Sequence, residues 1–388
     1  MNISELSNKY KQYVIDMRRE FHMYPEPSFK EFRTSKRIKE ELEKMGINCK
    51  AVAETGVEAV IQGGKPGKTV ALRADIDALE MQELNDVPYK SKTDGLMHGC
   101  GHDGHAAMLL GAAKILNEVK DEICGKVKLI FQPAEEIAQG ANKMIQEGVM
   151  EGVDGVFGIH LWSAIESGTV SIEAGPRMAA TDLFNITVKG KGGHGSMPNQ
   201  GIDAVVAASS IVMNLQSIVS RETSPLESVV VSVGKIVSGT RFNIIASEAE
   251  LIGGTRCFNK ELRQELPKII ERIAKNTAAS YRAEAELEYK FSTGPVINDE
   301  VPVNIGQGAV EKLLGKDALV HFEKITGGED FAYYLEKAPG ALAFVGIGNK
   351  EKDTYQAHHH GKFNMDEEAL EIGCALYAQF AVDFLQYE

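Results

Sequence analysis

The feature of this sequence that most constrains its fold is a change of pattern near residue 182. Before this point, short apolar runs alternate with segments of helical periodicity. This alternation predicts an α/β layer with a mostly parallel sheet and helices on both faces. From there to residue 293 the order of segments is β-α-β-β-α-β, which is typical of a ferredoxin-like α+β unit. We therefore predict a discontinuous first domain, residues 1–181 and 294–388, interrupted by an inserted domain, residues 182–293.

Hydrophobic periodicity gives the expected elements of both domains. In the first domain we predict strands at residues 56–61, 69–72, 127–131, 153–159 and 341–347. Helices are predicted there at residues 105–119, 142–149 and 303–314, and from residue 366. In the inserted domain we predict strands at residues 183–189, 228–237, 249–256 and 285–291, and helices at residues 202–220 and 260–281.

Length and charge restrict the class of protein. The 388 residues exceed the roughly 250–300 that one hydrophobic core serves, which favours two domains. The formal net charge is −13, with no Lys/Arg block, and this argues against nucleic-acid or anionic-membrane partners. No apolar run reaches the ~18 residues of a membrane span, and the N-terminus lacks the apolar core of a signal peptide. With five scattered cysteines, we expect a soluble cytoplasmic protein.

Residues 98–105 form the densest group of potential metal ligands. The segment reads His-Gly-Cys-Gly-His-Asp-Gly-His. Imidazole and thiolate bind borderline transition metals, and glycine lets the backbone turn so that side chains converge. A tight turn with incidental polar residues is one alternative. A nucleophilic Cys100–His102 pair is another, but it leaves the other polar clusters unexplained.

Further polar residues stand at or near the ends of predicted elements. Glu135 and Glu136 follow one apolar strand, His160 follows another, and a His triplet at 358–360 precedes the last helix. Ligands of α/β sheets lie beyond the carboxyl ends of strands, so these groups are expected to converge. One Glu can bind metal while its neighbour acts as a general base. Taken one at a time, these motifs have simpler explanations. A Glu pair is common in the first turn of a helix, where it suits the helix dipole, and a lone His is often a buried core residue.

About five ligands exceed one tetrahedral zinc site, so a pair of divalent ions fits the set better. A zinc-finger assignment fails because Cys-x-x-Cys knuckles are missing from the sequence. The inserted domain has its own signal, a glycine-rich loop at residues 189–198 that presents His194. The order of residues in this loop is not that of a phosphate-binding loop. We interpret it as a mobile loop that offers an imidazole to an oxyanion.

Together these motifs resemble the M20 metallopeptidase family, in the branch of hippurate hydrolases, N-acyl-amino-acid deacetylases and auxin-conjugate hydrolases. The resemblance covers nearly the whole chain. It runs through residues 22–27, 73–79, 98–105, 132–136, 158–161, 192–194, 327–331 and 359–367.

The resemblance implies a role for each matching residue. The implied metal ligands are Cys100, His102, Glu136, His160 and His359. Glu135 matches the catalytic base, and Asp75 matches an Asp that supports the metal site. His194 matches a lid-domain His that reaches the partner's active site in family dimers, while Asn243 and Arg256 match positions that hold substrate. Counting back four residues from Phe363 selects His359, but leaves His358 as an alternative.

The same resemblance implies an activity and its requirements. We expect a metal-dependent amidohydrolase of N-acyl amino acids, with two divalent ions (Mn, Zn, Co or Ni) per subunit. Residues 182–293 would be a lid and dimerisation domain of a homodimer or homotetramer. Two departures, Glu80 in place of Pro and residues 137–140 in place of a Gly-rich stretch, bear on the acyl pocket. Alternatives are a small-peptide hydrolase and a non-catalytic metal- or ligand-binding protein; the spare Glu135 argues against the latter.

Overall fold

The computed structural model describes residues 2–387 and divides them into two compact units. The first unit extends to Arg177 and includes residues 297–323 and 330–387. The second unit comprises Met178–Val296 together with Lys324–Glu329. The second stretch belongs to this unit because the Ala179 backbone N–H donates to the carbonyl of Ile325. Sequence periodicity predicted residues 182–293 for this unit, a few residues inside the observed limits. It did not predict that Lys324–Glu329 belongs to the same unit.

A seven-stranded sheet forms the centre of the first unit, in the order β1-β2-β4-β3-β5-β15-β6. Its strands are β1 (Cys49–Val52), β2 (Gly56–Gln62), β3 (Lys65–Asp75), β4 (Cys124–Gln132), β5 (Gly155–Glu166), β6 (Val170–Ser171) and β15 (Gly340–Gly348). The four central strands, β4 to β15, run parallel, and the edge strands are antiparallel. Parallel strands covered on both faces are apolar along their length. The sheet is therefore the mostly parallel one that the sequence predicts.

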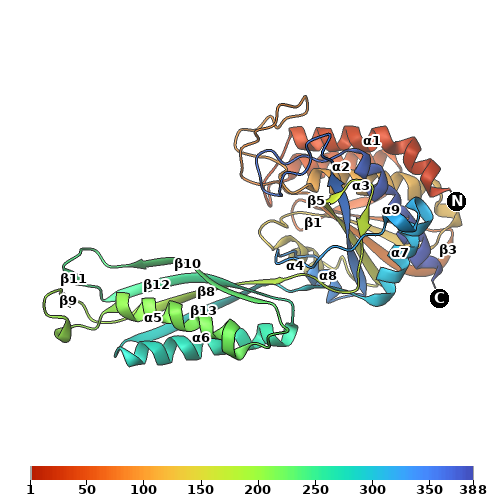
Figure 1. Cartoon of the computed structure of the whole chain (residues 1–388). Coiled ribbons are helices and arrows are strands. Elements are labelled where there is room, and N and C mark those ends of the chain that lie inside the picture. The colour runs from red at the N-terminus through yellow and green to blue at the C-terminus, as the bar shows by residue number, and fades with distance from the viewer. Residues whose placement is uncertain (1, 388) are drawn as a thin grey trace. The chain divides into compact units, whose positions relative to one another are not determined.

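Helices cover both faces of this sheet (Figure 1). The helices of the unit are α1 (Ile3–Met23), α2 (Phe32–Lys44), α3 (His102–Glu118), α4 (Gly140–Gln146), α7 (Glu300–Leu314), α8 (Ala332–Leu335) and α9 (Glu368–Gln386). On one face Phe157 of β5 stacks on Phe380 of α9, with ring centroids 3.9 Å apart. The next residue, Gly158, faces Phe331 near α8, because successive side chains of a strand point to opposite faces.

The second unit is a four-stranded antiparallel sheet with two helices (Figure 1). Its main elements are β8 (Ala180–Lys189), α5 (Ala204–Ser217), β10 (Val229–Ser238), β12 (Glu248–Cys257), α6 (Lys260–Ser280) and β13 (Glu284–Thr293). The strands lie in the order β10-β12-β8-β13, and both helices contact the sheet. Two short strands, β9 (Gly193–His194) and β11 (Ile244–Ile245), pair as a separate ribbon. This is the β-α-β-β-α-β order that the sequence predicts.

One helical segment of the second unit, Ala204–Glu222, is long and apolar enough to cross a membrane by length and composition alone. Its most apolar window has a mean hydropathy of 1.2, and 33% of that window is buried within the fold. The buried side chains, which include Ile211 and Leu215, belong to the core of the second unit. Packing of α5 on the sheet therefore explains the buried third of this segment, while Val205, Val206 and Met213 stay exposed.

Candidate metal centre

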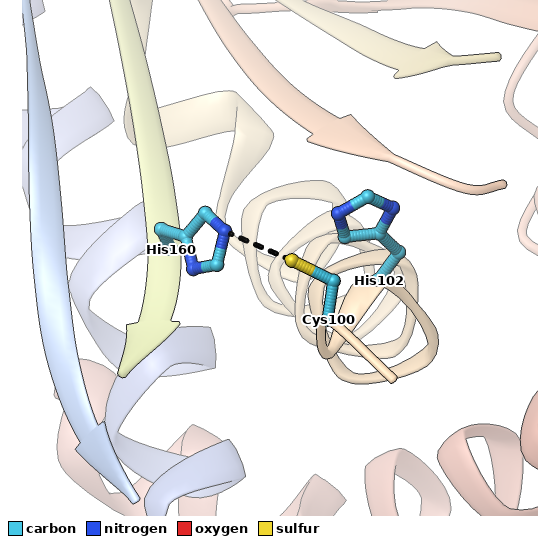
Figure 2. A group of neighbouring side chains, drawn as sticks. All are labelled: Cys100, His102 and His160. Carbon is cyan, nitrogen blue, oxygen red and sulfur yellow. Dashed lines mark hydrogen bonds between the residues drawn. The ribbon is translucent and has the colours of Figure 1, made fainter. Parts of the chain in front are cut away.

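The cluster of metal-ligating side chains lies along one edge region of the parallel sheet of the first unit. Asp75 is the last residue of β3 and the Glu135–Glu136 pair follows β4. His160 lies midway along β5, which continues to Glu166 instead of ending before His160 as the sequence predicts. The N-terminus of α3 brings Cys100 and His102 to the same place. Figure 2 shows Cys100 and His160 pointing toward each other, with Cys100 Sγ 3.6 Å from His160 Nε2.

Gly101 explains how Cys100 and His102 reach one point. It is the N-cap of α3 and has φ 96°, in the left-handed region that favours glycine. The helix thus begins at His102, whereas periodicity predicted a start at residue 105. The sequence signal was obscured because the first turn of α3 carries polar side chains that serve the cluster rather than the apolar core.

Backbone carbonyls fix the protonation of two histidines. The Nδ1 atoms of His102 and His160 lie 2.9 Å and 2.8 Å from the carbonyl oxygens of Asp77 and Leu161. A carbonyl can only accept, so each neutral ring carries its proton on Nδ1 and presents an unprotonated Nε2. Within residues 2–387, the buried Nε2 of His102 has no hydrogen-bond partner. Both rings are therefore oriented as metal ligands.

His105, in contrast, has both ring nitrogens engaged. Its Nε2 accepts a hydrogen bond from the Leu161 backbone N–H at 2.9 Å. Its Nδ1–H therefore donates to Asp75 Oδ1 at 2.6 Å. The ring has no free lone pair for a metal, so it acts as a link between β5 and Asp75.

Asp75 is the centre of a buried network of charges. Its Oδ2 accepts from Arg73 Nη1 at 2.7 Å and lies 3.7 Å from His102 Nε2. Although burial opposes ionisation, His102, His105 and Arg73 together hold the pKa of Asp75 well below its usual range. Asp330, a further partner of Arg73 at 2.9 Å, also accepts from the Gln132 amide. Asp75 is thus a fixed carboxylate beside Nε2 of His102, on the same side of the ring as the other donors.

Two adjacent carboxylates face His102 from the turn after β4. The Oε1 of Glu136 lies 3.9 Å from His102 Nε2 and is buried with no hydrogen-bond partner in the described chain. Burial raises the pKa of Glu136 to about 7, and the nearby carboxylates of Asp77 and Asp75 act in the same direction. Glu135 Oε2 lies 4.0 Å from the same nitrogen. The cluster is therefore rich in negative charge and in unsatisfied acceptors.

The two candidate histidines of the triplet occupy different environments. His359 Nε2 lies 3.6 Å from Glu136 Oε2, and its backbone has φ 60°. His358 Nε2 instead accepts from the Ser163 backbone N–H at 3.3 Å, and its ring stacks on Trp162 with centroids 4.3 Å apart. Burial lowers the pKa of His358 to about 3. The geometry thus brings His359, and not His358, next to Glu136.

The donor set fits a pair of divalent ions. Two groups of three side chains have ligand atoms within 4.8 Å of one another and share Cys100. One group is Cys100, His102 and His160, and the other is Cys100, Glu136 and His359. Sulfur, nitrogen and oxygen donors together suit transition metals, and divalent cations would satisfy the buried acceptors described above. These are the five side chains that the sequence resemblance implies as ligands.

The other residues singled out in the sequence belong to the second unit. His194 is exposed on β9, and its Nδ1 accepts from the Ser196 backbone N–H at 3.1 Å. The neutral ring therefore carries its proton on Nε2, as a hydrogen-bond donor. Asn243 is also exposed, and its carbonyl accepts from the Gly195 N–H. Arg256 lines a hollow of about 530 Å³ on the sheet.

Sequence reasoning missed Asp77, which supports the cluster from two sides. Its carbonyl orients His102, and its Oδ2 accepts from the Glu136 backbone N–H at 3.1 Å. The available signal was the spacing of Arg73, Asp75 and Asp77, three charged residues at alternate positions at the end of a buried strand. Alternate positions of a strand share one face, so such charges would lie together.

Comparisons with known proteins agree with this geometry. The family model described as peptidase family M20/M25/M40 matches residues 71–383. An N-acetylcysteine deacetylase of Bacillus subtilis is 44% identical, over 96% of this chain and 97% of its own. Thermostable carboxypeptidase 2 of Saccharolobus solfataricus is 41% identical, over 98% of both chains. The crystal structure of the Bacillus subtilis YXEP protein, described as a dinuclear metal-binding peptidase from the M20 family, has a TM-score of 0.88. It is 39% identical, and the match covers 98% of this chain and 100% of that one.

A parallel sheet whose strand ends carry sulfur, nitrogen and oxygen donors beside a spare carboxylate defines a metallohydrolase. The chain belongs to peptidase family M20/M25/M40, as its match to the family model and its identity with these relatives show.

Proposed function

We propose that this protein is a metal-dependent amidohydrolase that converts N-acyl amino acids to a carboxylic acid and a free amino acid. The observation that carries the proposal is the position of Glu135. Its Oε2 lies 4.0 Å from His102 Nε2, beside the donor cluster, and its side chain is only 11% exposed. A carboxylate held there can act as a general base. The deacetylase that is 44% identical supports the substrate class.

We assign the metal pair to the five donors of the two groups that share Cys100, namely Cys100, His102, Glu136, His160 and His359. The mixture of donors suits Mn, Zn, Co or Ni. When bound, such ions polarise the amide carbonyl and lower the pKa of water. Asp75 supports this arrangement, since it lies 3.7 Å from His102 Nε2 and receives a hydrogen bond from His105.

The chain's own residues then move the protons and hold the substrate. Glu135 accepts a proton from the attacking water and returns it to the amine nitrogen as the C–N bond breaks. The water oxygen ends in the carboxylic acid product. His194 donates from Nε2–H to the oxygen of the tetrahedral intermediate. Asn243 and Arg256 hold the amino-acid part of the substrate, for which a guanidinium is the natural partner of a carboxylate.

The assembly that we propose is a homodimer or homotetramer in the cytoplasm, with His194 serving the active site of the partner subunit. In this arrangement the second unit is a lid and dimerisation domain. The formal net charge of −13 supports a small-molecule partner in place of a nucleic acid or an anionic membrane.

A small-peptide hydrolase is the second candidate, and the similarity to thermostable carboxypeptidase 2 favours it. Both activities would use the same carboxylate and the same donors, and they differ only in the acyl group that is accepted. A non-catalytic metal- or ligand-binding protein is a third candidate, but it would have no use for Glu135 beside the donors.

A substrate screen distinguishes these candidates. The enzyme, reconstituted separately with Mn, Zn, Co and Ni, would be assayed on N-acetyl, N-benzoyl and indole-acyl amino acids and on dipeptides. We expect hydrolysis of one or more N-acyl amino acids, and a loss of roughly 10²–10⁴ in kcat for Glu135→Gln with metal content preserved. Faster turnover of dipeptides would support the second candidate. Undiminished turnover by metal-loaded Glu135→Gln would exclude Glu135 as the base.

A further inference from the structure

The backbone on each side of Glu135 is held by a buried carboxylate. The N–H of Glu136 donates to Asp77 Oδ2 at 3.1 Å, and the N–H of Ala134 donates to Glu31 Oε1 at 2.9 Å. Asp77 and Glu31 are 1% and 0% exposed. Two acceptors thus fix the peptide units that flank the proposed base, and one of them, Glu31, has no role in the function described so far.

The turn that carries Glu135 needs such support. Ala134 has φ 53°, in the left-handed region that residues with a Cβ rarely adopt. Its carbonyl accepts from the Gly140 N–H at 3.1 Å, which closes the turn. Its N–H points the other way, into the protein, where Glu31 is the acceptor. Without that acceptor the amide would be a buried donor with no partner, and the turn would be free to relax.

The Glu31 side chain is directed toward the Ala134 amide and does not cap α2, the helix that it precedes. It occupies the N-cap position of α2 but makes no side-chain capping bond there. Glu26 accepts from the backbone N–H groups of Arg33 and Thr34 instead. The second oxygen of Glu31 accepts from Thr55 Oγ1 at 2.6 Å. Both oxygens are therefore directed away from α2, and one of them reaches the turn.

The segment that contains Glu31 touches both supports of the turn. Ser28 donates to Asp77 Oδ2 at 2.7 Å, so the acceptor of the Glu136 amide is itself fixed from residues 26–31. The Ala78 N–H also donates to the carbonyl of Glu26 at 2.9 Å. A buried carboxylate without a cationic partner is costly, and such groups concentrate at functional sites.

We propose that Glu31 is a positioning residue, whose hydrogen bond to the Ala134 amide sets the direction in which the Glu135 carboxylate leaves the turn. This inference rests on the proposed function, since it requires Glu135 as the base. Glu31 contacts neither the donors nor, in the proposal, the substrate. Its loss is therefore expected to affect kcat and to leave metal content and KM nearly unchanged.

Three variants of the metal-loaded enzyme test the proposal. Glu31→Leu removes the acceptor but fills the same space with an apolar side chain, and Glu31→Ala serves as a second variant should Leu disturb folding. Both should lose ~10²-fold in kcat, the scale of a misplaced catalytic group. Glu31→Gln, whose amide oxygen can still accept from Ala134 while its NH₂ donates to Thr55, should keep kcat within about threefold of wild type.

A matched control is Glu58→Ala. Glu58 is another buried carboxylate of the first unit, but its partners are Lys50 and Lys128 and not the turn. The Glu58→Ala variant should keep the wild-type kcat even if its melting temperature falls. The proposal is overturned if Glu31→Leu and Glu31→Ala retain kcat, if Glu31→Gln is as slow as they are, or if metal content falls in step with kcat. Glu135→Gln is assayed in parallel: should it turn over normally, the failure lies in the proposed function and not in the role of Glu31.

Discussion

The chemistry of the cluster depends on which ring nitrogen of each histidine carries the proton. The carbonyls of Asp77 and Leu161 settle this for His102 and His160, because they can only accept. The Leu161 N–H gives His105 the same Nδ1–H tautomer, but it occupies the Nε2 lone pair that the other two rings leave available. Three histidines close together thus receive different roles from backbone groups, which residue type alone does not reveal.

If Cys100 binds a metal, its thiol should be protected from alkylation in the metal-loaded protein and not in the metal-free protein. In the metal-loaded protein Cys100 should resist alkylation by iodoacetamide, because a coordinated thiolate is shielded. After chelation it should react, slowly, since burial raises the pKa of its thiol well above the usual range. Peptide mapping by mass spectrometry gives the extent at each site. Cys49, which is half-buried and remote from the cluster, is the internal control and should react equally in both states. Equal labelling of Cys100 with and without metal would contradict ligation.

Glu31 predicts a pH-dependent stability of the metal-free protein. Burial raises its pKa to about 7, against an ordinary value of 4.5. The folded state therefore holds this proton more tightly than the unfolded state, and the associated stability is present below pH 4.5 and lost as pH rises through 7. Glu31→Gln has no proton to lose. At pH 8 it should exceed wild type by up to about 3 kcal/mol in free energy of unfolding.

Urea denaturation in the presence of a chelator measures this difference, which should shrink toward zero near pH 4.5. Metal-loaded protein should show a smaller difference, because cations in the cluster favour the ionised carboxylate. A constant difference between the two proteins across this pH range would show that Glu31 is ionised in the folded protein throughout.

At the scale of elements, the strands and helices that position the cluster follow from sequence periodicity, while the turns between them do not. The predicted strand at residues 127–131 lies within β4, and the alternation of apolar runs gave the parallel sheet. The order of edge strands such as β6 had no local signal, because two residues are too few to show a period. Spacing from Phe363 selected His359 but left His358 open, because sequence does not show that His359 lies beside Glu136 while His358 accepts from the Ser163 N–H.

The supports of the cluster were hidden for a related reason. Asp77 and Glu31 contact backbone N–H groups that lie 59 and 103 residues away in the chain. Every residue but proline has such an N–H, so no particular side chain marks the partner. The candidate ligands could be proposed from sequence because their chemistry is concentrated in short motifs. Asp77 and Glu31, which support these ligands, could not be predicted, because the backbone groups they contact come within reach only in the folded chain.

The turn after β4 makes a prediction at this scale. A Cβ added at Gly140 would lie 1.6 Å from the carbonyl oxygen of Pro133, which is backbone and cannot move aside. Gly140→Ala should therefore displace the turn, cost about 3 kcal/mol or more of unfolding free energy and reduce metal occupancy. Gly308→Ala is the control, since nothing lies within 4 Å of its added Cβ in α7.

That control should stabilise the protein by roughly 0.4–1 kcal/mol, as expected for Gly→Ala at a compatible helical position. Chemical denaturation and elemental analysis of both variants give the two readouts. If Gly140→Ala keeps full stability and metal content, the turn tolerates a shift that its packing does not indicate.

At the scale of the whole molecule, the proposed chemistry is divided between the two units. The donors and Glu135 belong to the first unit, and His194 belongs to the second. Activity would then require both units, while metal binding would require only the first. Substitution of His194 should accordingly lower kcat by roughly 10²–10³ without changing metal content.

Subunit exchange tests whether His194 acts on the partner. Glu135→Gln and His194→Ala subunits, each inactive alone, would be mixed and allowed to exchange. In a mixed dimer one active site would carry both defects and the other neither, so up to half of the dimers' sites could work. Recovery of activity is the expected result. Confirmed exchange without recovery would mean that His194 acts within its own chain or has no catalytic role.

The first unit is built from separated stretches of the chain, and this has a consequence for the order of events during synthesis. Strand β15 lies inside the sheet between β5 and β6, and α9 and His359 also come from the last stretch of the chain. The second unit comes almost entirely from one earlier stretch and can fold while translation continues. Under the proposed ligand set, the ribosome therefore makes His359 after the other four donors and after the second unit, so the complete donor set exists only once synthesis has passed residue 359.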